Sequence, residues 1–216
     1  RGLHRRDRLS RLFTDAWIPE DALVRRLGVL PQSLRERFHP ALHTAPVTHF
    51  TPSLVGFEAW ARLRRWTGWD RMIRRNTWFQ DRVVRYAKAH RLFECAASPP
   101  PVVFAYSYAA RRIFQHAQAA GCPSVLGQID AGPYEEDLVV RQHEQYPQYS
   151  DGAVRAPERY WVNWRKECEQ ADTIIVNSEW SRRALDQVGV DISKVYVVPL
   201  IYERPSNAEG PRTYPQ

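Results

Sequence analysis

The sequence of 216 residues has few sulfur-containing residues and lacks several common functional motifs. It contains one methionine and three cysteines, Cys95, Cys122 and Cys168, which are odd in number and widely spaced. This spacing suits neither a metal site nor a disulfide framework, and it favours buried thiols in a reducing compartment. Gly-x-Gly-x-x-Gly, Gly-x-x-x-x-Gly-Lys-Ser/Thr and Gly-x-Ser-x-Gly motifs are absent, and the seven histidines have no metal-ligand spacing. The sequence therefore disfavours a self-contained dinucleotide or phosphate-loop site, a metal centre and a hydrolase nucleophile.

Long apolar runs are also absent. No run approaches the roughly 20 residues that cross a bilayer, and no basic and then apolar secretion signal opens the sequence. We therefore expect a cytoplasmic protein. The content of 44% hydrophobic and 12% aromatic residues indicates a folded globular domain rather than a disordered chain.

Short apolar runs alternate with amphipathic helical patterns along most of the chain. The runs at residues 102–105, 125–129, 173–176 and 195–198 predict buried, neighbouring, parallel strands. Repeated strand-helix units predict an α/β fold, namely a Rossmann-like parallel sheet with helices on both faces. Upstream, we expect a short strand at 12–14, an arginine-rich helical region at 19–38, an extended segment at 46–50 and a long helical region at 54–90.

The most informative part of the sequence is its last third. Residues 171–185 read ADTIIVNSEWSRRAL, and residues 194–200 read KVYVVPL. The first segment predicts a strand, a small polar pair and a helix, and the second predicts a further strand. This order resembles the end of the N-terminal lobe of family 4 glycosyltransferases, which are two-lobed GT-B enzymes. The resemblance is close over residues 101–203 and weaker over residues 11–91.

The resemblance implies that residues 1–203 form the Rossmann-like acceptor-binding lobe, without the family's first strand. Residues 204–216 have linker composition and would lead to a donor-binding lobe that this sequence does not contain. The implied reaction is metal-independent transfer of a sugar, with retention, from a nucleotide-sugar donor to an acceptor such as a lipid-linked sugar or a polysaccharide precursor. The resemblance assigns the catalytic carboxylates and the nucleotide pocket to the other lobe. We therefore expect this lobe to bind no cofactor and to be inactive alone.

Polar residues follow three of the predicted strands, at the edge where open parallel sheets bind ligands. These residues are Tyr106, Ser107, Gln128, Asp130, Asn177 and Ser178, and we expect them to line an acceptor and interlobe cleft. The family often has a histidine after the second strand, and Asp130 stands there instead. Asp130 is thus a candidate acceptor base or acceptor-hydroxyl ligand, and capping of the turn at residues 131–133 is the competing interpretation.

Two serines are expected as helix N-caps. Ser107 and Ser178 each stand between a predicted strand and a predicted helix. The free N–H groups of such a helix start would suit the phosphates of a nucleotide sugar or of a phosphorylated acceptor.

The net charge of +7 and the pI of about 9.6 predict an anionic partner. Basic residues recur at helical spacing, with two tryptophans beside them: Arg71, Arg74, Arg75, Arg82, Arg85, Trp66 and Trp78. Interfacial helices combine these residue types, so this face is a candidate membrane contact, and a peripheral position on the inner membrane face stays open. A solvated cover for the sheet is the competing interpretation. A noncatalytic scaffold lobe and a nucleic-acid-binding module are the alternative functions, and the lack of a nucleic-acid motif disfavours the latter.

Overall fold

A computed structural model describes residues 1–19, 37–94, 99–150, 152 and 154–200. The helical region expected at 19–38 lies almost entirely outside these ranges. The expected linker at 204–216 and the predicted buried thiol of Cys95 also lie outside them.

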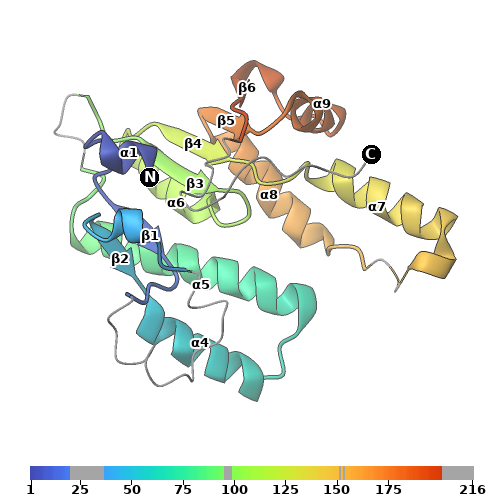
Figure 1. Cartoon of the computed structure of the whole chain (residues 1–216), viewed down its shortest axis with the longest axis horizontal. Helices are drawn as coiled ribbons and strands as arrows, with labels where there is room; N and C mark the ends of the chain where they lie inside the picture. Colours follow the sequence, from blue (N-terminus) through green and yellow to red (C-terminus); the bar gives the residue numbers. More distant parts are fainter. Residues whose placement is uncertain (20–36, 95–98, 151, 153, 201–216) are drawn as a thin grey trace, which may run out of the picture.

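The described strands form two parallel sheets. β1 (Leu12–Thr14) pairs with β2 (Val47–His49), while β3 (Val103–Tyr106), β4 (Ser124–Gly127), β5 (Thr173–Val176) and β6 (Val195–Val197) form a second sheet in that order. The strands of the second sheet alternate with helices, as Figure 1 shows. The predicted Rossmann-like α/β fold is confirmed, and so is the neighbouring parallel order of the four central strands.

Helices and short 3-10 turns connect the strands. The helices are α1 (Gly2–Arg5), α4 (Thr51–Leu63), α5 (Gly68–Ala89), α6 (Arg111–Ala119), α7 (Pro133–Gln145), α8 (Glu158–Gln170) and α9 (Glu179–Gln187). The 3-10 turns are η1 (Pro40–Leu42), η2 (Pro147–Tyr149) and η3 (Ile192–Lys194).

The long helical region predicted at 54–90 is two helices rather than one. The backbone has positive φ at Arg65 (55°) and at Gly68 (50°), which a continuous right-handed helix does not allow. The Trp66 N–H donates to the Ala61 carbonyl at 2.9 Å and closes the end of α4. The chain therefore reverses at residues 64–67, and α5 returns beside α4 (Figure 1).

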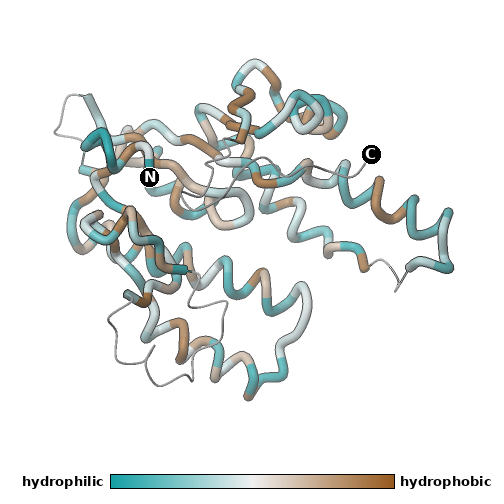
Figure 2. Tube along the Cα trace, in the orientation of Figure 1, coloured by the Kyte–Doolittle hydropathy of each residue, from teal (hydrophilic) through white to brown (hydrophobic). Residues whose placement is uncertain are grey.

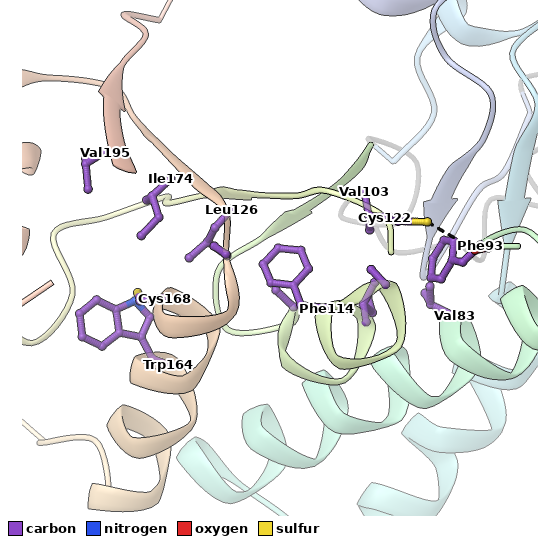
Figure 3. Packing of buried hydrophobic residues seen from close by; sticks show 14 of the residues in the cluster. Val83, Phe93, Val103, Phe114, Cys122, Leu126, Trp164, Cys168, Ile174 and Val195 are labelled. Atoms are coloured by element: carbon purple, nitrogen blue, oxygen red, sulfur yellow. Dashed lines mark hydrogen bonds between the residues drawn. The ribbon is translucent and has the colours of Figure 1, made fainter. Parts of the chain in front are cut away.

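The core lies between the four-stranded sheet and the helices on one of its faces. Figure 2 shows hydrophobic stretches along β4, β5 and β6, whereas α9 is largely hydrophilic. Val83 of α5, Phe114 of α6 and Trp164 of α8 pack with Leu126 and Ile174 of the strands (Figure 3). Right-handed crossovers between consecutive neighbouring strands place their helices on the same face. The core is therefore one continuous layer under the sheet.

The opposite face of the sheet differs from the prediction of fully buried strands. Phe104, Tyr106 and Tyr196 alternate with buried or partly buried residues and are exposed to between 48% and 63%. A Cβ on Gly127 would lie 2.6 Å from Cζ of Phe104, so this ring covers the glycine. Among the described residues, helices α5, α6, α8 and α9 cover one side of the sheet, and the strands are therefore buried on that side and not on the other.

Candidate functional site

Asp130 lies just beyond β4 and is held by hydrogen bonds to a single oxygen. Its Oδ1 accepts from the Tyr108 hydroxyl at 2.5 Å, from Gln128 Nε2 at 3.2 Å and from the Gly132 N–H at 2.8 Å. The bond from Gly132 is the predicted turn cap. Within the described residues, Oδ2 receives no hydrogen bond, and the residue is partly exposed. The turn fixes the carboxylate and leaves one oxygen for another donor.

Gln128 connects Asp130 to the core. Its amide Oε1 accepts from Trp164 Nε1 at 3.0 Å, while its Nε2 donates to Asp130. Trp164 is completely buried, and Gln128 is 6% exposed. The amide orientation is therefore set from inside the protein, and this limits movement of Asp130.

Tyr108 is a site residue that the sequence did not predict. Its φ of 72° is uncommon for a bulky residue, and its ring stacks on Tyr160 with 4.7 Å between centroids. Burial, and then the nearby negative charge of Asp130, raise the Tyr108 pKa far above its ordinary value. The hydroxyl therefore stays protonated and donates to Asp130. A tyrosine two residues beyond a strand end carries no pattern that reveals this backbone conformation.

Ser107 has a different role from the predicted N-cap. Helix α6 begins at Arg111, and Ser107 is buried, with its Oγ accepting from the Ile129 N–H at 3.4 Å. The Ser107 N–H also donates to the Gly127 carbonyl at 3.0 Å. Ser107 thus continues the pairing of β3 with β4 and does not face the surface.

The N–H groups before α6 are occupied by a carboxylate of the protein itself. Glu167 of α8 accepts from the N–H groups of Tyr108 at 2.6 Å, Ala110 at 2.9 Å and Arg111 at 3.1 Å. Burial raises the pKa of Glu167 to about 7, and the three donors act in the opposite direction. The expectation of an anion site for a ligand beside Ser107 is therefore wrong, because Glu167 fills it.

The end of β5 matches its prediction more closely. Ser178 caps α9 by accepting from the Ser181 N–H at 3.1 Å, and Asn177 Oδ1 accepts from Ser181 Oγ at 3.0 Å. Asn177 is exposed and Ser178 is partly exposed. Both lie beyond the strand that neighbours β4, but no hydrogen bond among the described residues joins them to Asp130.

The predicted site residues do not all meet. Gln128 and Asp130 are in direct contact, whereas the Tyr106 ring lies on the exposed sheet face, edge-on to Phe104 at 5.2 Å. Alternation along β3 explains this separation, since adjacent side chains point to opposite faces of a sheet.

A small polar cavity lies behind Tyr108. Its volume is about 90 Å³, and its polar lining residues include Asn76, Thr77, Gln80, Arg111, Arg112, Asn163 and Glu167. Arg111 donates from Nη1 to Asn163 at 2.5 Å, and its buried Nε has no partner. The cavity has room for several waters but is smaller than the roughly 300–1,000 Å³ typical of ligand pockets. We therefore place the candidate site at Asp130 rather than in this cavity.

The basic face predicted on α5 is largely paired with acidic residues. Arg71 bonds to Glu58, Arg74 bonds to Asp70 at 2.8 Å, and Arg75 bonds to Asp15 at 2.6 Å. Arg85 Nε donates to the Asp81 carbonyl at 3.2 Å, and the Nε of Arg82 is buried. Trp78 packs on Phe57, and Trp66 lies 4.4 Å from the Arg74 guanidinium. These ion pairs reduce the attraction of the face for an external anion.

Neither a metal cluster nor a known relative adds to this geometry. Among the described residues, no group of His, Cys, Asp and Glu side chains could hold a metal ion. None of the described helices combines the length and hydropathy that a bilayer crossing requires. Comparisons with models of protein families, with curated proteins and with solved structures found no match. The comparisons therefore add no function to the geometry of the site.

Proposed function

We propose that this chain is the acceptor-binding lobe of a retaining glycosyltransferase and that Asp130 binds the acceptor hydroxyl. The observation that carries the proposal is the Asp130 carboxylate, fixed through Oδ1 and open at Oδ2. It lies beyond the carboxyl end of a parallel strand, which is where such sheets bind ligands. The sequence resemblance in residues 171–200 supports the reaction class.

Asp130 would accept a hydrogen bond from the sugar hydroxyl at Oδ2. A carboxylate in this position orients the hydroxyl and can take up its proton as the new glycosidic bond forms. Tyr108 and Gln128 would hold the carboxylate still, so little reorganisation is needed when the acceptor arrives. Tyr108 is therefore a positioning residue.

The nucleotide-sugar donor would bind mainly outside this lobe. Glu167 already fills the N–H groups beside α6, and the sequence has no phosphate-binding loop. The proposal therefore assigns the donor phosphates and the catalytic carboxylates to a second lobe. The acceptor class would be a lipid-linked sugar or a polysaccharide precursor.

Saccharide binding tests this assignment on the chain itself. Saturation-transfer NMR with a panel of mono- and oligosaccharides should detect an acceptor, and Asp130→Asn should weaken its binding. Asp186→Asn is the matched control, since Asp186 is exposed on α9. In an enzyme that contains this lobe together with a donor lobe, Asp130→Asn should lower kcat/KM at least about tenfold, or about 1.4 kcal/mol.

Tyr108→Phe separates positioning from folding, because the variant keeps the ring stack and loses only the hydroxyl donor. It should lower kcat/KM less than Asp130→Asn does, with thermal stability close to that of the parent. Unchanged kinetics in Asp130→Asn would leave Asp130 as a turn residue and refute its proposed role.

A further inference from the structure

Helix α4 exposes an apolar face. Its exposed apolar residues are Pro52, Val55, Gly56, Ala59, Trp60 and Leu63, and Arg62 is exposed at the edge of this face. The largest of them are far from buried, since Val55 is 60% exposed, Trp60 47% and Leu63 73%. At about 100° per residue, these six apolar residues span an arc of roughly 140° that contains no charged side chain.

The opposite side of α4 is apolar as well. Leu54 and Ala61 are buried, and the Phe57 ring packs on Trp78 of α5 at 5.4 Å. Figure 2 shows the hydrophobic stretches along this helix, which lies at the edge of the molecule in this view. A helix on a water-exposed surface normally has a polar outer side. The outer side of α4 thus has the composition of a buried surface.

Unpaired arginines lie at the carboxyl end of this face. Arg62, Arg64 and Arg65 are exposed, and no ion pair to them occurs among the described residues. The Arg64 guanidinium lies 4.8 Å from the Trp60 ring. The arginines at 71, 74 and 75 on α5 differ, because each is paired with a carboxylate.

We propose that the outer face of α4, together with Arg62, Arg64 and Arg65, docks the protein on an anionic membrane. We call these residues the α4 surface. Interfacial helices bury an apolar face among the acyl chains, while arginine meets anionic headgroups and tryptophan lies at the boundary. The exposed helix and the unpaired cations at its end match such a planar anionic partner. This surface differs from the basic face of α5 that the sequence suggested.

Ring contacts connect the start of α5, a few residues after the α4 surface, to the candidate site. Trp69 follows the 64–67 turn and contacts Tyr160 with 4.9 Å between centroids. Tyr160 stacks on Tyr108, which in turn bonds to Asp130. If the proposed function holds, a membrane-bound acceptor would be presented near Asp130. The docking itself does not depend on that function.

Vesicle co-sedimentation tests the docking without donor or acceptor. The chain should bind vesicles of phosphatidylcholine with 30% phosphatidylglycerol, and it should bind pure phosphatidylcholine vesicles much more weakly. Each basic residue near an anionic surface contributes about fivefold, so changing Arg62, Arg64 and Arg65 to Gln should weaken binding by on the order of 100-fold. Raising the salt to 1 M should also release the protein, because the screening length falls to about 3 Å.

The apolar face needs its own variant. Trp60→Ser with Leu63→Ser should weaken binding at least about tenfold, because less apolar area enters the membrane. Trp60→Phe should keep binding but reduce fluorescence quenching by brominated lipids. Circular dichroism and thermal melting verify that each variant is folded.

Matched control variants test whether binding depends on the α4 surface or only on the net charge of the protein. Arg141, Arg165 and Arg183 are exposed on other helices, and changing them to Gln alters the net charge equally, so this variant should bind almost like the parent. Asp130→Asn should also bind normally, which keeps failure of docking distinct from failure of the proposed function. Absent binding, equal binding to neutral vesicles, or full binding by the Arg62, Arg64 and Arg65 variant would overturn the proposal. Self-association that Trp60→Ser abolishes would identify the face as a contact between copies and would likewise overturn it.

Discussion

Replacing Glu167 should destabilise the protein strongly, although the side chain lies in a helix. Its carboxylate is 1% exposed and accepts hydrogen bonds from the N–H groups of Tyr108, Ala110 and Arg111. Glu167→Ala removes all three acceptor contacts. Each buried donor left without a partner costs about 1–3 kcal/mol.

For three donors the total loss of stability would be about 3–9 kcal/mol, and the adjoining cavity determines where in this range it falls. Glu167 lines the cavity of about 90 Å³, so water can reach some of the N–H groups that Glu167→Ala leaves free. We therefore expect a loss near the lower limit, about 3 kcal/mol. Glu167→Gln keeps one acceptor oxygen for Ala110 and Arg111 but turns an NH2 group toward the Tyr108 N–H. Its expected loss is about 1–2 kcal/mol.

Urea unfolding followed by circular dichroism measures these losses. A loss of 3 kcal/mol should lower the melting temperature by about 6–12 °C for a domain of this size. Glu169→Ala is the control, because Glu169 is exposed two residues further along α8 and should change stability by less than about 0.5 kcal/mol. If Glu167→Ala matched this control, the carboxylate would not be the partner of the α6 N–H groups.

Three further predictions test the same region. Burial raises the pKa of Glu167 from 4.5 to about 7, so between these pH values the folded state holds a proton that the unfolded chain releases. The Glu167 contribution to stability should therefore fall by about 2–3 kcal/mol between pH 5 and pH 8. A pH series of urea midpoints should show this decline in the parent and not in Glu167→Gln. Gly132→Ala should cost about 2–4 kcal/mol, because φ is 64° and the new Cβ would lie 3.0 Å from the buried Trp164 ring, whereas Gly121→Ala at φ 73° has free space and should cost only about 1–2 kcal/mol; equal urea midpoints would contradict this. Burial raises the pKa of Cys168 to about 12 and Cys122 is also buried, so in a Cys95→Ser background both thiols should resist Ellman's reagent at pH 8 until the protein unfolds, and rapid reaction of the native protein would refute this.

The sequence was sufficient to predict the central sheet because its signals are local. The runs ending at Ala105, Ile129, Val176 and Val198 are apolar, and a helical pattern separates each from the next, which determines both the strands and their parallel order. The sequence did not correctly predict the burial of these strands, which are buried on one face of the sheet rather than on both. A strand residue such as Tyr196 could pack against another element, but the sequence of the strand does not show whether any element lies over that face of the sheet.

The candidate site was harder to predict than the fold. Asp130 and Gln128 were found because they stand at a strand end, and strand ends are visible in the sequence. Tyr108 and Glu167 were not, since their roles depend on contacts across 22 and 59 positions of the chain. The pairing of Arg75 with Asp15 was missed for the same reason, because the two residues lie 60 positions apart, whereas Asp70 stands one helical turn before Arg74.

The hydrogen bond from the Tyr108 N–H to Glu167 gives the start of α6 a structural role. In open parallel sheets this kind of helix start often holds a ligand anion, but here the carboxylate of Glu167 holds the backbone of Tyr108 in its uncommon conformation. That conformation places the hydroxyl on Asp130. Glu167→Gln should fold, and it is expected to weaken acceptor binding although Glu167 does not touch the acceptor. In a Tyr108→Phe background, Glu167→Gln should have no further effect on acceptor binding. Additive losses in the double variant would show instead that Glu167 stabilises the fold without positioning Asp130.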